Sequence, residues 1–471
     1  MPFSDLREFL DFLKDEGELS TIDIEIDPYL EIGAVGHLTR MGPAVLFTNV
    51  KGSDKKVAIN ILGTRKRIAL ALGIEEKDVI SRLAYVYENP IKPVIVSDGP
   101  CKENILKGEA VDMGIFPVPQ WNDKDGGKFS DFGICLTKDP ETGFQNAGMY
   151  RQHIKGKKKT GVYAGDKSHI GMHYKKAKEM GLDYLEMAVA IGLDPAVNMV
   201  GPCPAEYGLN EFDLAGGLRQ EPVQMVKAET VDIMVPATAE IILEGRIPIG
   251  VYEEEGPFGE FTGYYSGTYQ HPVFEITAIT HRDNPIFQGT YLAKMPTEGH
   301  VLPETFNSAM IYAQAKKNAP EIAGVYCFDG TWALMASVSM KKEFEGQIHQ
   351  VANAFFATHV GKWTKVLVIV DDDINVYDKE DLVWAMMSRY QPEFDTYVIP
   401  RVAGIGIDPS ERVIKSRGIE TGGVSNLSSR IIIDATRSLE RTVMGEVVKS
   451  PVITSEVEKR LKDNRIELKK Y

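Results

Sequence analysis

The sequence predicts a mixed α/β protein built from three parts. Helix-like and strand-like segments alternate toward both ends of the chain, and short strand-like runs fill its middle. With 471 residues, of which 43% are hydrophobic, the chain exceeds the roughly 250–300 residues at which a single core stops growing. Two or three hydrophobic cores are therefore expected.

The opening segment begins with a predicted helix over roughly 4–16. Ser4 is the expected N-cap, and Gly17 follows where a C-terminal glycine belongs. The apolar face of this helix is formed by Leu6, Phe9, Leu10 and Leu13.

Two strands are expected after this helix. Ile22, Ile24 and Ile26 alternate with polar residues, as in a half-buried strand, and Val45-Leu46-Phe47 is a second apolar run. The first part, residues 1–111, is therefore expected to be α/β.

From about residue 112 to 302 the pattern changes to short strand-like runs separated by Gly, Pro and Asn. Examples are the runs at 133–137 and 272–277. This spacing predicts an antiparallel sheet or barrel, interrupted by a helix over roughly 168–181.

Beyond Pro303 the pattern of helix and buried strand returns, so residues 303–471 are again expected to be α/β. Phe306, Met310 and Ala313 fit one helical face. The apolar run 365–370 predicts a parallel strand, and it ends in Asp371-Asp372-Asp373. These acids mark either a functional edge of the sheet or a solvated turn.

Charge and composition exclude several classes of protein. The net charge of −14 argues against nucleic acid as a partner, because such proteins gather Lys and Arg on one face. The absence of a signal-peptide pattern and of any run of about 18 apolar residues predicts a cytoplasmic protein without membrane insertion. The four cysteines show no CxxC pairing and are expected to be reduced thiols.

The most unusual string in the chain is Glu255-Gly256-Pro257-Phe258-Gly259-Glu260. Gly-Pro and Phe-Gly form turns, so both glutamates should lie on an irregular loop. If they share a pocket, repulsion and desolvation raise one pKa enough for proton donation. The alternative is a solvated acidic hairpin.

A second string, 144–153, contains Asn146-Ala147-Gly148-Met149-Tyr150-Arg151. Its small residues let the backbone approach a ligand, and Arg151 can bind a carboxylate or phosphate with two hydrogen bonds. An ordinary hairpin is the alternative.

Metal ligands can also be nominated, although spacing alone does not establish a site. His169 and His173 are one helical turn apart, and Glu229 lies in a strand-like context. An Asn amide oxygen, an imidazole and a carboxylate suit Mg²⁺ or Mn²⁺. No GxGxxG after a strand, no P-loop and no GxSxG motif occurs, which disfavours ordinary dinucleotide, P-loop and serine-hydrolase functions.

Five motifs together resemble the UbiD family of reversible decarboxylases, in order and in spacing, over nearly the whole chain. They are Asn146–Arg151, Ser168-His169, 226–230, 235–240 and 255–264.

The resemblance implies an N-terminal α/β domain (1–111), a central split β-barrel that binds the flavin and metal (112–302), and a C-terminal α/β domain for oligomerisation (303–471). It implies prenylated FMN as cofactor, supplied by a separate flavin prenyltransferase. A divalent metal, usually Mn²⁺, holds the cofactor phosphate, with K⁺ nearby. A homodimer or hexamer is expected.

By position in the motifs, the resemblance implies roles for individual residues. The metal ligands would be Asn146, His169 and Glu229. Cofactor contacts would come from Ala147, Gly148, Met149, Tyr150, Arg151, Ser168, the 200–204 stretch, and either His359 or Lys362. Glu260 would be the proton donor, in a network with Arg151 and Glu255. His300 either lines the substrate side of the pocket or is an ordinary loop histidine.

The expected reaction is non-oxidative release of CO₂ from an aromatic or heteroaromatic acid. Breaking a bond between an sp² carbon and a carboxylate requires an organic electron sink, while the protein orients substrate and delivers a proton. Alternatives are a cinnamic-type acid as substrate, a catalytic subunit of a multisubunit carboxylase, hydride transfer by plain FMN, and an inactive subunit. The intact Arg151, Glu255 and Glu260 set speaks against the last.

Overall fold

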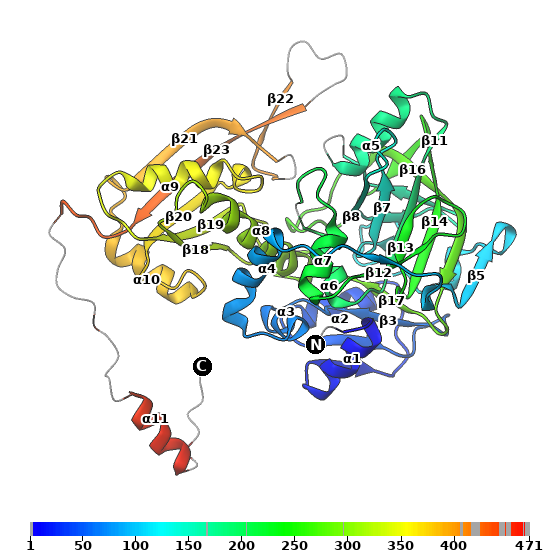
Figure 1. Ribbon diagram of the computed structural model, residues 1–471, viewed down its shortest axis with the longest axis horizontal. Helices are drawn as coiled ribbons and strands as arrows, with labels where there is room; N and C mark the ends of the chain where they lie inside the picture. Colours follow the sequence, from blue (N-terminus) through cyan, green and yellow to red (C-terminus); the bar gives the residue numbers. More distant parts are fainter. Residues whose placement is uncertain are drawn as a thin grey trace.

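The structure is a computed structural model. It describes residues 3–165, 168–203, 205–294, 296–405, 408–415, 424–441, 448, 454–464 and 466. Helices and strands are mixed throughout, as predicted, and the strands form four sheets. In Figure 1 the sheet of the C-terminal part lies on one side of helix α8, and the N-terminal and central parts lie on the other.

The N-terminal part is a four-stranded sheet with helices packed around it. The strand order is β1-β2-β3-β17, with bounds β1 Leu19–Ile22, β2 Ala44–Phe47, β3 Lys56–Ile59 and β17 Ile286–Gly289. The last strand returns from far along the chain and pairs in parallel with β3. The helices are α1 Leu6–Asp15, α2 Glu31–Thr39, α3 Arg65–Leu72 and α4 Val79–Glu88.

Helix α1 forms where the apolar spacing predicted it, and its four predicted apolar residues are buried. Its N-cap is Asp5 and not Ser4, because the Asp5 carboxylate accepts the Glu8 N–H at 2.9 Å. Gly17 follows the helix with φ +71°, as expected of a C-terminal glycine.

The strand predicted from alternating isoleucines is wrong in position. Strand β1 ends at Ile22. Ile24 is 69% exposed, and Ile26 contributes only an isolated bridge to Val50. The three isoleucines therefore do not lie in one strand. The second predicted strand, 45–47, is confirmed as β2.

The central part is a ten-stranded antiparallel sheet. Its order is β6-β9-β10-β16-β14-β11-β7-β8, with β5 and β15 also paired to β16. The pairings among the described residues confirm the antiparallel sheet, but they follow an open path and do not show a closed barrel. The bounds are β5 Asn104–Lys107, β6 Phe129–Ser130, β7 Ile134–Lys138, β8 Gln145–Met149, β9 Gln152–Ile154, β10 Lys159–Val162, β11 Tyr184–Ile191, β14 Ile241–Pro248, β15 Tyr252–Glu255 and β16 Tyr269–His281.

Three helices and a small sheet accompany the ten-stranded sheet. The helix predicted at 168–181 is α5, His169–Glu179, capped by Ser168. The other helices are α6 Pro195–Val200 and α7 Glu211–Arg219. The small sheet has the order β13-β12-β4, with bounds β13 Met234–Pro236, β12 Gln224–Lys227 and β4 Val94–Ile95.

The C-terminal part is a six-stranded sheet with helices, as predicted. Its order is β18-β19-β20-β23-β21, with β22 paired to β23. The predicted buried strand is β20, which runs parallel to β19 and β23. The bounds are α8 Glu298–Ala315, β18 Ile322–Cys327, β19 Met335–Met340, α9 Gln347–Phe356, β20 Val366–Asp371, α10 Lys379–Arg389, β21 Thr396–Ala403, β22 Arg412–Lys415, β23 Val424–Ala435 and α11 Thr454–Asp463.

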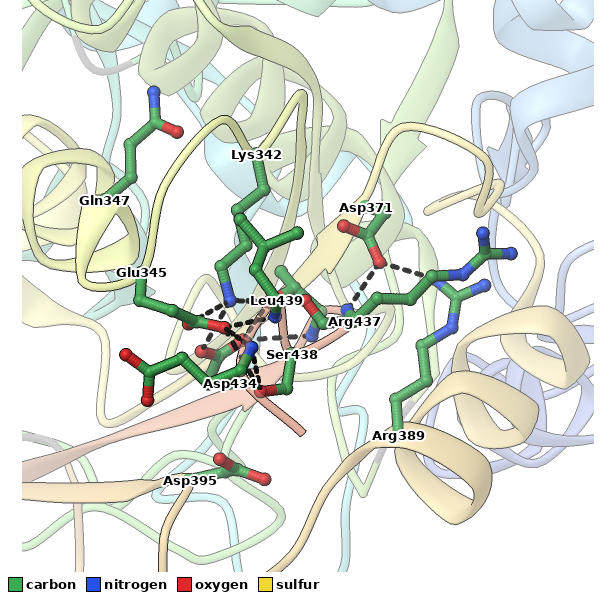
Figure 2. Close-up of polar contacts among 12 residues, drawn as sticks. Lys342, Glu345, Gln347, Asp371, Arg389, Asp395, Asp434, Arg437, Ser438 and Leu439 are labelled. Carbon is green, nitrogen blue, oxygen red and sulfur yellow. Dashed lines mark hydrogen bonds and ion pairs between the residues drawn. The ribbon is translucent and has the colours of Figure 1, made fainter. Parts of the chain in front are cut away.

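The acids that end β20 are paired with arginines. Arg389, whose side chain is 3% exposed, donates to Asp371 at 2.7 Å and forms two 2.8 Å bonds with Asp373. Figure 2 shows Arg389 and Arg437 approaching Asp371 from different segments. This end of the strand therefore ties α10 and the segment after β23 to the sheet.

Two expectations from composition can be compared with the structure. All four cysteines are free and buried. Within the described ranges, no helix is both long enough and apolar enough to cross a bilayer.

Candidate active site

The acidic string of the sequence forms a loop that leaves the edge of the ten-stranded sheet. Glu255 is the last residue of β15, and its side chain is fully buried. The chain then turns at Gly256, whose φ of +90° favours glycine. Glu260 follows with a side chain that is 19% exposed. The two carboxylates are thus held on one turn at different depths.

Arg151 joins these two carboxylates. It lies between β8 and β9, and its side chain is 7% exposed. Its Nε and Nη2 donate to the two oxygens of Glu255, each at 2.7 Å, and its Nη1 donates to Glu260. The three residues therefore form one buried network, and a solvated hairpin is excluded for this string.

Two aromatic rings lie close to the guanidinium of Arg151. Its central carbon lies 4.5 Å from the ring centre of Tyr163 and 5.0 Å from that of Phe258. Such rings attract the cation and exclude water, which strengthens the pairing with both acids.

The environment of Glu260 suits proton donation. Burial raises the pKa of Glu260, and the adjacent Arg151 offsets part of this rise. A carboxyl with a raised pKa can hold its proton closer to neutral pH, as a general acid must.

Backbone contacts fix the turn that carries Glu260. The Gly259 N–H donates to Asp125 at 2.9 Å, and the Phe258 N–H donates to Ser266 Oγ at 3.1 Å. The Glu260 N–H donates to the Tyr264 carbonyl at 2.9 Å. Ser266 Oγ also accepts from Arg151 Nη2 at 3.4 Å. Neither Asp125 nor Ser266 stood out in the sequence.

A second polar cluster lies where β8 meets the start of α5. The end of the Asn146 amide that faces them lies 2.5 Å from His169 Nδ1 and 3.2 Å from Glu211 Oε1; an amide oxygen there can bind a cation, and an amide nitrogen there can donate to both. Glu211, at the start of α7, is 1% exposed, and its Oε2 accepts the Ala147 N–H at 3.0 Å. Asn146, His169 and Glu211 therefore converge from three different elements.

The structure does not bring Glu229 into this cluster. Its two carboxylate oxygens accept from Lys102 at 2.6 Å and Lys107 at 2.8 Å. These ion pairs lower the pKa of Glu229. The carboxylate beside Asn146 is Glu211, which the sequence analysis missed.

Glu211 has the features of a ligand for a divalent cation. Burial raises its pKa to about 8, and no ion pair reaches it within the part of the chain that the structure describes. An Asn, a His and a Glu offer the nitrogen and oxygen donors that Mn²⁺ accepts. Among the described residues, no three His, Cys, Asp or Glu side chains are grouped so as to hold a metal ion. The cluster of Asn146, His169 and Glu211 contains two residues of these types, and its third member is an asparagine.

The loop after Asn146 is closely packed. A Cβ atom on Gly148 would lie 2.8 Å from the ring of Tyr150, so only glycine fits beneath this ring. The Met149 N–H donates to the Gly201 carbonyl at 3.1 Å. The 200–203 stretch therefore lies beside the loop, while Pro204 falls outside the described residues.

Helix α5 starts beside the same loop. Ser168 Oγ accepts the Gly171 N–H at 3.2 Å and donates to the Gly165 carbonyl at 2.7 Å. The N-terminus of a helix favours anions such as phosphate. His173, one turn further, directs its Nδ1 to Thr137 Oγ1 at 2.8 Å.

The C-terminal part contributes one predicted residue near this cluster. Burial lowers the pKa of His169, and the charge of His359 lowers it further. The His359 N–H donates to Gln314 of α8 at 3.0 Å. Lys362 lies 5.1 Å from the ring centre of Trp363. The geometry favours neither His359 nor Lys362 as a cofactor contact.

Three family models match the chain almost end to end. They describe domains of a 3-octaprenyl-4-hydroxybenzoate carboxy-lyase, named UbiD: the N-terminal domain at 10–86, the Rift-related domain at 92–295 and the C-terminal domain at 300–435. A phenolic acid decarboxylase of Bacillus subtilis is 31% identical over an alignment of 482 positions, which covers 98% of this chain and 99% of the relative.

Solved structures with the same fold are also enzymes of this kind. The UbiD-class enzyme HmfF of Pelotomaculum thermopropionicum, in complex with FMN, is 32% identical with a TM-score of 0.87, covering 96% of this chain and 98% of that chain. An evolved dimeric form of HmfF was solved with prFMN. The vanillic acid decarboxylase of Sedimentibacter hydroxybenzoicus is 30% identical with a TM-score of 0.88, covering 99% of this chain and 100% of that chain.

Proposed function

The chain belongs to the UbiD family of carboxy-lyases, and on that premise we propose that it is a prenylated-FMN-dependent, reversible decarboxylase of an aromatic or heteroaromatic acid. The observation that carries this proposal is the buried network in which Arg151 binds both Glu255 and Glu260. The network places a carboxyl whose pKa is raised by burial beside an arginine that can also bind a substrate carboxylate.

The names of the relatives support the class of substrate. Vanillic acid decarboxylase and phenolic acid decarboxylase both act on aromatic acids by name. A cinnamic-type acid stays the alternative substrate.

The residues present fit the cofactor that the family implies. Asn146, His169 and Glu211 would hold Mn²⁺, and Glu211 replaces Glu229 in this proposal because it is the buried carboxylate beside Asn146. The 146–151 loop and the start of α5 would bind the flavin phosphate. K⁺ would bind beside residues 200–203, whose backbone lies against the 146–151 loop.

When bound, prenylated FMN supplies the electron sink for the pair of electrons that the departing CO₂ leaves behind. Arg151 orients Glu255 and the substrate carboxylate. The rings of Tyr163 and Phe258 keep water away from these charges. CO₂ is neutral, so it no longer pairs with Arg151 as the substrate carboxylate did, and it can leave the site.

Glu260 completes the reaction by delivering a proton. The bond between carbon and carboxylate breaks, and the carbon receives the Glu260 proton in a new C–H bond. Glu260 can regain a proton from water because its side chain is 19% exposed. Because each step is reversible, high CO₂ drives carboxylation.

A second candidate is a catalytic subunit that needs a further component. The vanillic acid decarboxylase was solved together with a component called VdcD. We also propose a homo-oligomer, either dimer or hexamer; among the relatives, an evolved form of HmfF is dimeric.

The test is CO₂ release from a panel of aromatic, heteroaromatic and cinnamic acids, with product identification. The protein is produced with and without a flavin prenyltransferase and supplied with Mn²⁺ and K⁺. We expect turnover of at least one ring-bearing acid only after co-production. Turnover that is equal without the prenyltransferase would contradict the choice of cofactor. NAD(P)H oxidation without CO₂ release would indicate a flavin oxidoreductase instead.

A further inference from the structure

His300 has no part in the chemistry described so far, yet it is completely buried and uses both ring nitrogens. It lies in the first turn of α8. Its Nδ1 faces the Thr297 N–H at 3.1 Å and the Thr297 hydroxyl at 2.7 Å. Its Nε2 lies 2.5 Å from the carbonyl oxygen of Phe261.

These partners determine where the proton of the ring resides. A backbone N–H can only donate, so Nδ1 accepts from Thr297 and carries no proton. A carbonyl oxygen can only accept, so Nε2 carries the proton and donates to Phe261. Burial lowers the pKa of His300, which favours this neutral form. With both nitrogens in use, the ring has no donor or acceptor left for a substrate.

The acceptor of this hydrogen bond lies next to the proton donor. Phe261 follows Glu260 directly, and the turn closes through bonds from the Glu260 N–H to Tyr264 and from the Gly263 N–H to Glu260. The contacts from Asp125 and Ser266 hold the turn before Glu260. His300 holds it on the other side.

Helix α8 connects this contact to the C-terminal sheet. Further along α8, Ser308 accepts the N–H of Cys327 at the end of β18 at 2.9 Å. The side chain of Glu304, also on α8, accepts the N–H groups of Gly330 and Trp332. The ring of Trp332 lies 6.0 Å from that of Phe261. The turn that carries Glu260 is therefore attached to an element that packs on the other half of the molecule.

We propose that His300 is a positioning residue, which fixes the Glu260 turn to α8 through the Phe261 carbonyl and does not contact the substrate. This proposal rests on the function proposed above, because it assigns His300 a role in placing the proton donor. The position of the Glu260 turn affects the rate, because a displacement of about 1 Å at a reacting group can lower it on the order of a hundredfold.

Two substitutions separate the two bonds of the ring. His300→Asn keeps an acceptor near the place of Nδ1, so the bond to Thr297 can persist, but it is too short to reach Phe261. His300→Gln keeps a donor near the place of Nε2 and loses the acceptor for Thr297. His349→Ala, at an exposed histidine of α9, is the control.

We expect kcat to fall on the order of tenfold to a hundredfold in His300→Asn with KM within about twofold of wild type. In His300→Gln we expect kcat within about threefold of wild type. Hydrogen exchange of a peptide covering 258–266, measured on the full chain, should be faster in His300→Asn and unchanged in His300→Gln.

Other outcomes overturn the proposal. Wild-type kcat and exchange in His300→Asn would show that the Phe261 bond does not position the turn. A raised KM in both variants with unchanged exchange would show that His300 contacts the substrate. Because both results require an active wild-type enzyme, they are distinct from failure of the proposed function, in which the wild type itself releases no CO₂.

Discussion

Buried and partly buried carboxylates with different partners are the main chemical feature at the scale of single residues. Glu255 and Glu260 share Arg151, Glu229 is neutralised by two lysines, and Glu211 has no ion pair in the described part of the chain. Because a buried charge without a partner is costly, Glu211 either holds a proton or binds a cation. This difference separates the proposed proton donor from the proposed metal ligand.

The first prediction concerns the metal site. Glu211→Gln should weaken Mn²⁺ binding at least about tenfold, because it removes an anionic ligand. Glu229→Gln is the matched control and should bind within about twofold of wild type, since Glu229 pairs with Lys102 and Lys107. Calorimetric titration of the purified protein with Mn²⁺ measures both. Weaker Mn²⁺ binding by Glu229→Gln than by Glu211→Gln would contradict this assignment and make Glu229 the metal ligand.

The second prediction concerns stability and pH. Burial raises the pKa of Glu298 from 4.5 to about 7. Between these values the folded state holds a proton that the unfolded state has lost, so this carboxyl lowers stability as pH rises from about 4.5 to 7. The total loss is about 3 kcal/mol, and it levels off above pH 7.

Glu298→Gln removes the ionisable group. Its amide oxygen can still accept the Leu62 N–H, which donates to Glu298 Oε1 at 2.6 Å in the wild type. Urea unfolding should therefore show the variant to be more stable than wild type at pH 8 and not at pH 5. Glu109→Gln, at a side chain that is 99% exposed, should show no such trend. Parallel pH curves for Glu298→Gln and wild type would refute the assignment.

At the scale of helices and strands, what could be predicted depended on local signals. Helix α1 and strand β20 follow from apolar spacing, because burial of one face is a local pattern. The N-cap of α1 did not follow, since Ser4 and Asp5 are both good caps and only the backbone selects Asp5. The pairing of β17 with β3 carries no local signal, because it joins residues more than two hundred positions apart.

The candidate site was predictable in the same uneven way. The resemblance carried by the five motifs implied that Arg151, Glu255 and Glu260 form one network, whereas their spacing alone left a solvated hairpin open. Glu211 was missed because an acid at the start of a helix is common and favourable in itself. Only the fold of β8 against α7 shows that its carboxyl turns inward to Asn146 and Ala147.

The third prediction concerns the attachment of α10 to the end of β20. Arg389→Met leaves Asp371 and Asp373 without their buried partner and should cost about 3 kcal/mol. Arg437→Ala removes a side chain that is 46% exposed and should cost at most about 1 kcal/mol. Urea unfolding followed by tryptophan fluorescence measures both, because Trp384 lies 5.1 Å from Arg389. Equal losses in the two variants would contradict the account.

At the scale of the whole molecule, the site depends on both halves of the chain. Arg151 and Glu255 come from the ten-stranded sheet, while α8 connects the Glu260 turn to the C-terminal sheet. Figure 1 shows α8 between these two sheets. The proton donor is thus held by contacts from both sides of the molecule, and its position depends on how they pack together.

The most direct test of the central claim is the rate of CO₂ release by Glu260→Gln, loaded with prenylated FMN and compared with wild type on the same acid. The variant should retain the flavin, because Glu260 lies outside the proposed metal and phosphate contacts, and should lose nearly all turnover. Glu253→Gln is the control, at a half-exposed glutamate paired with Lys159, and should turn over normally. Normal turnover by flavin-loaded Glu260→Gln would contradict the assignment of Glu260 as proton donor.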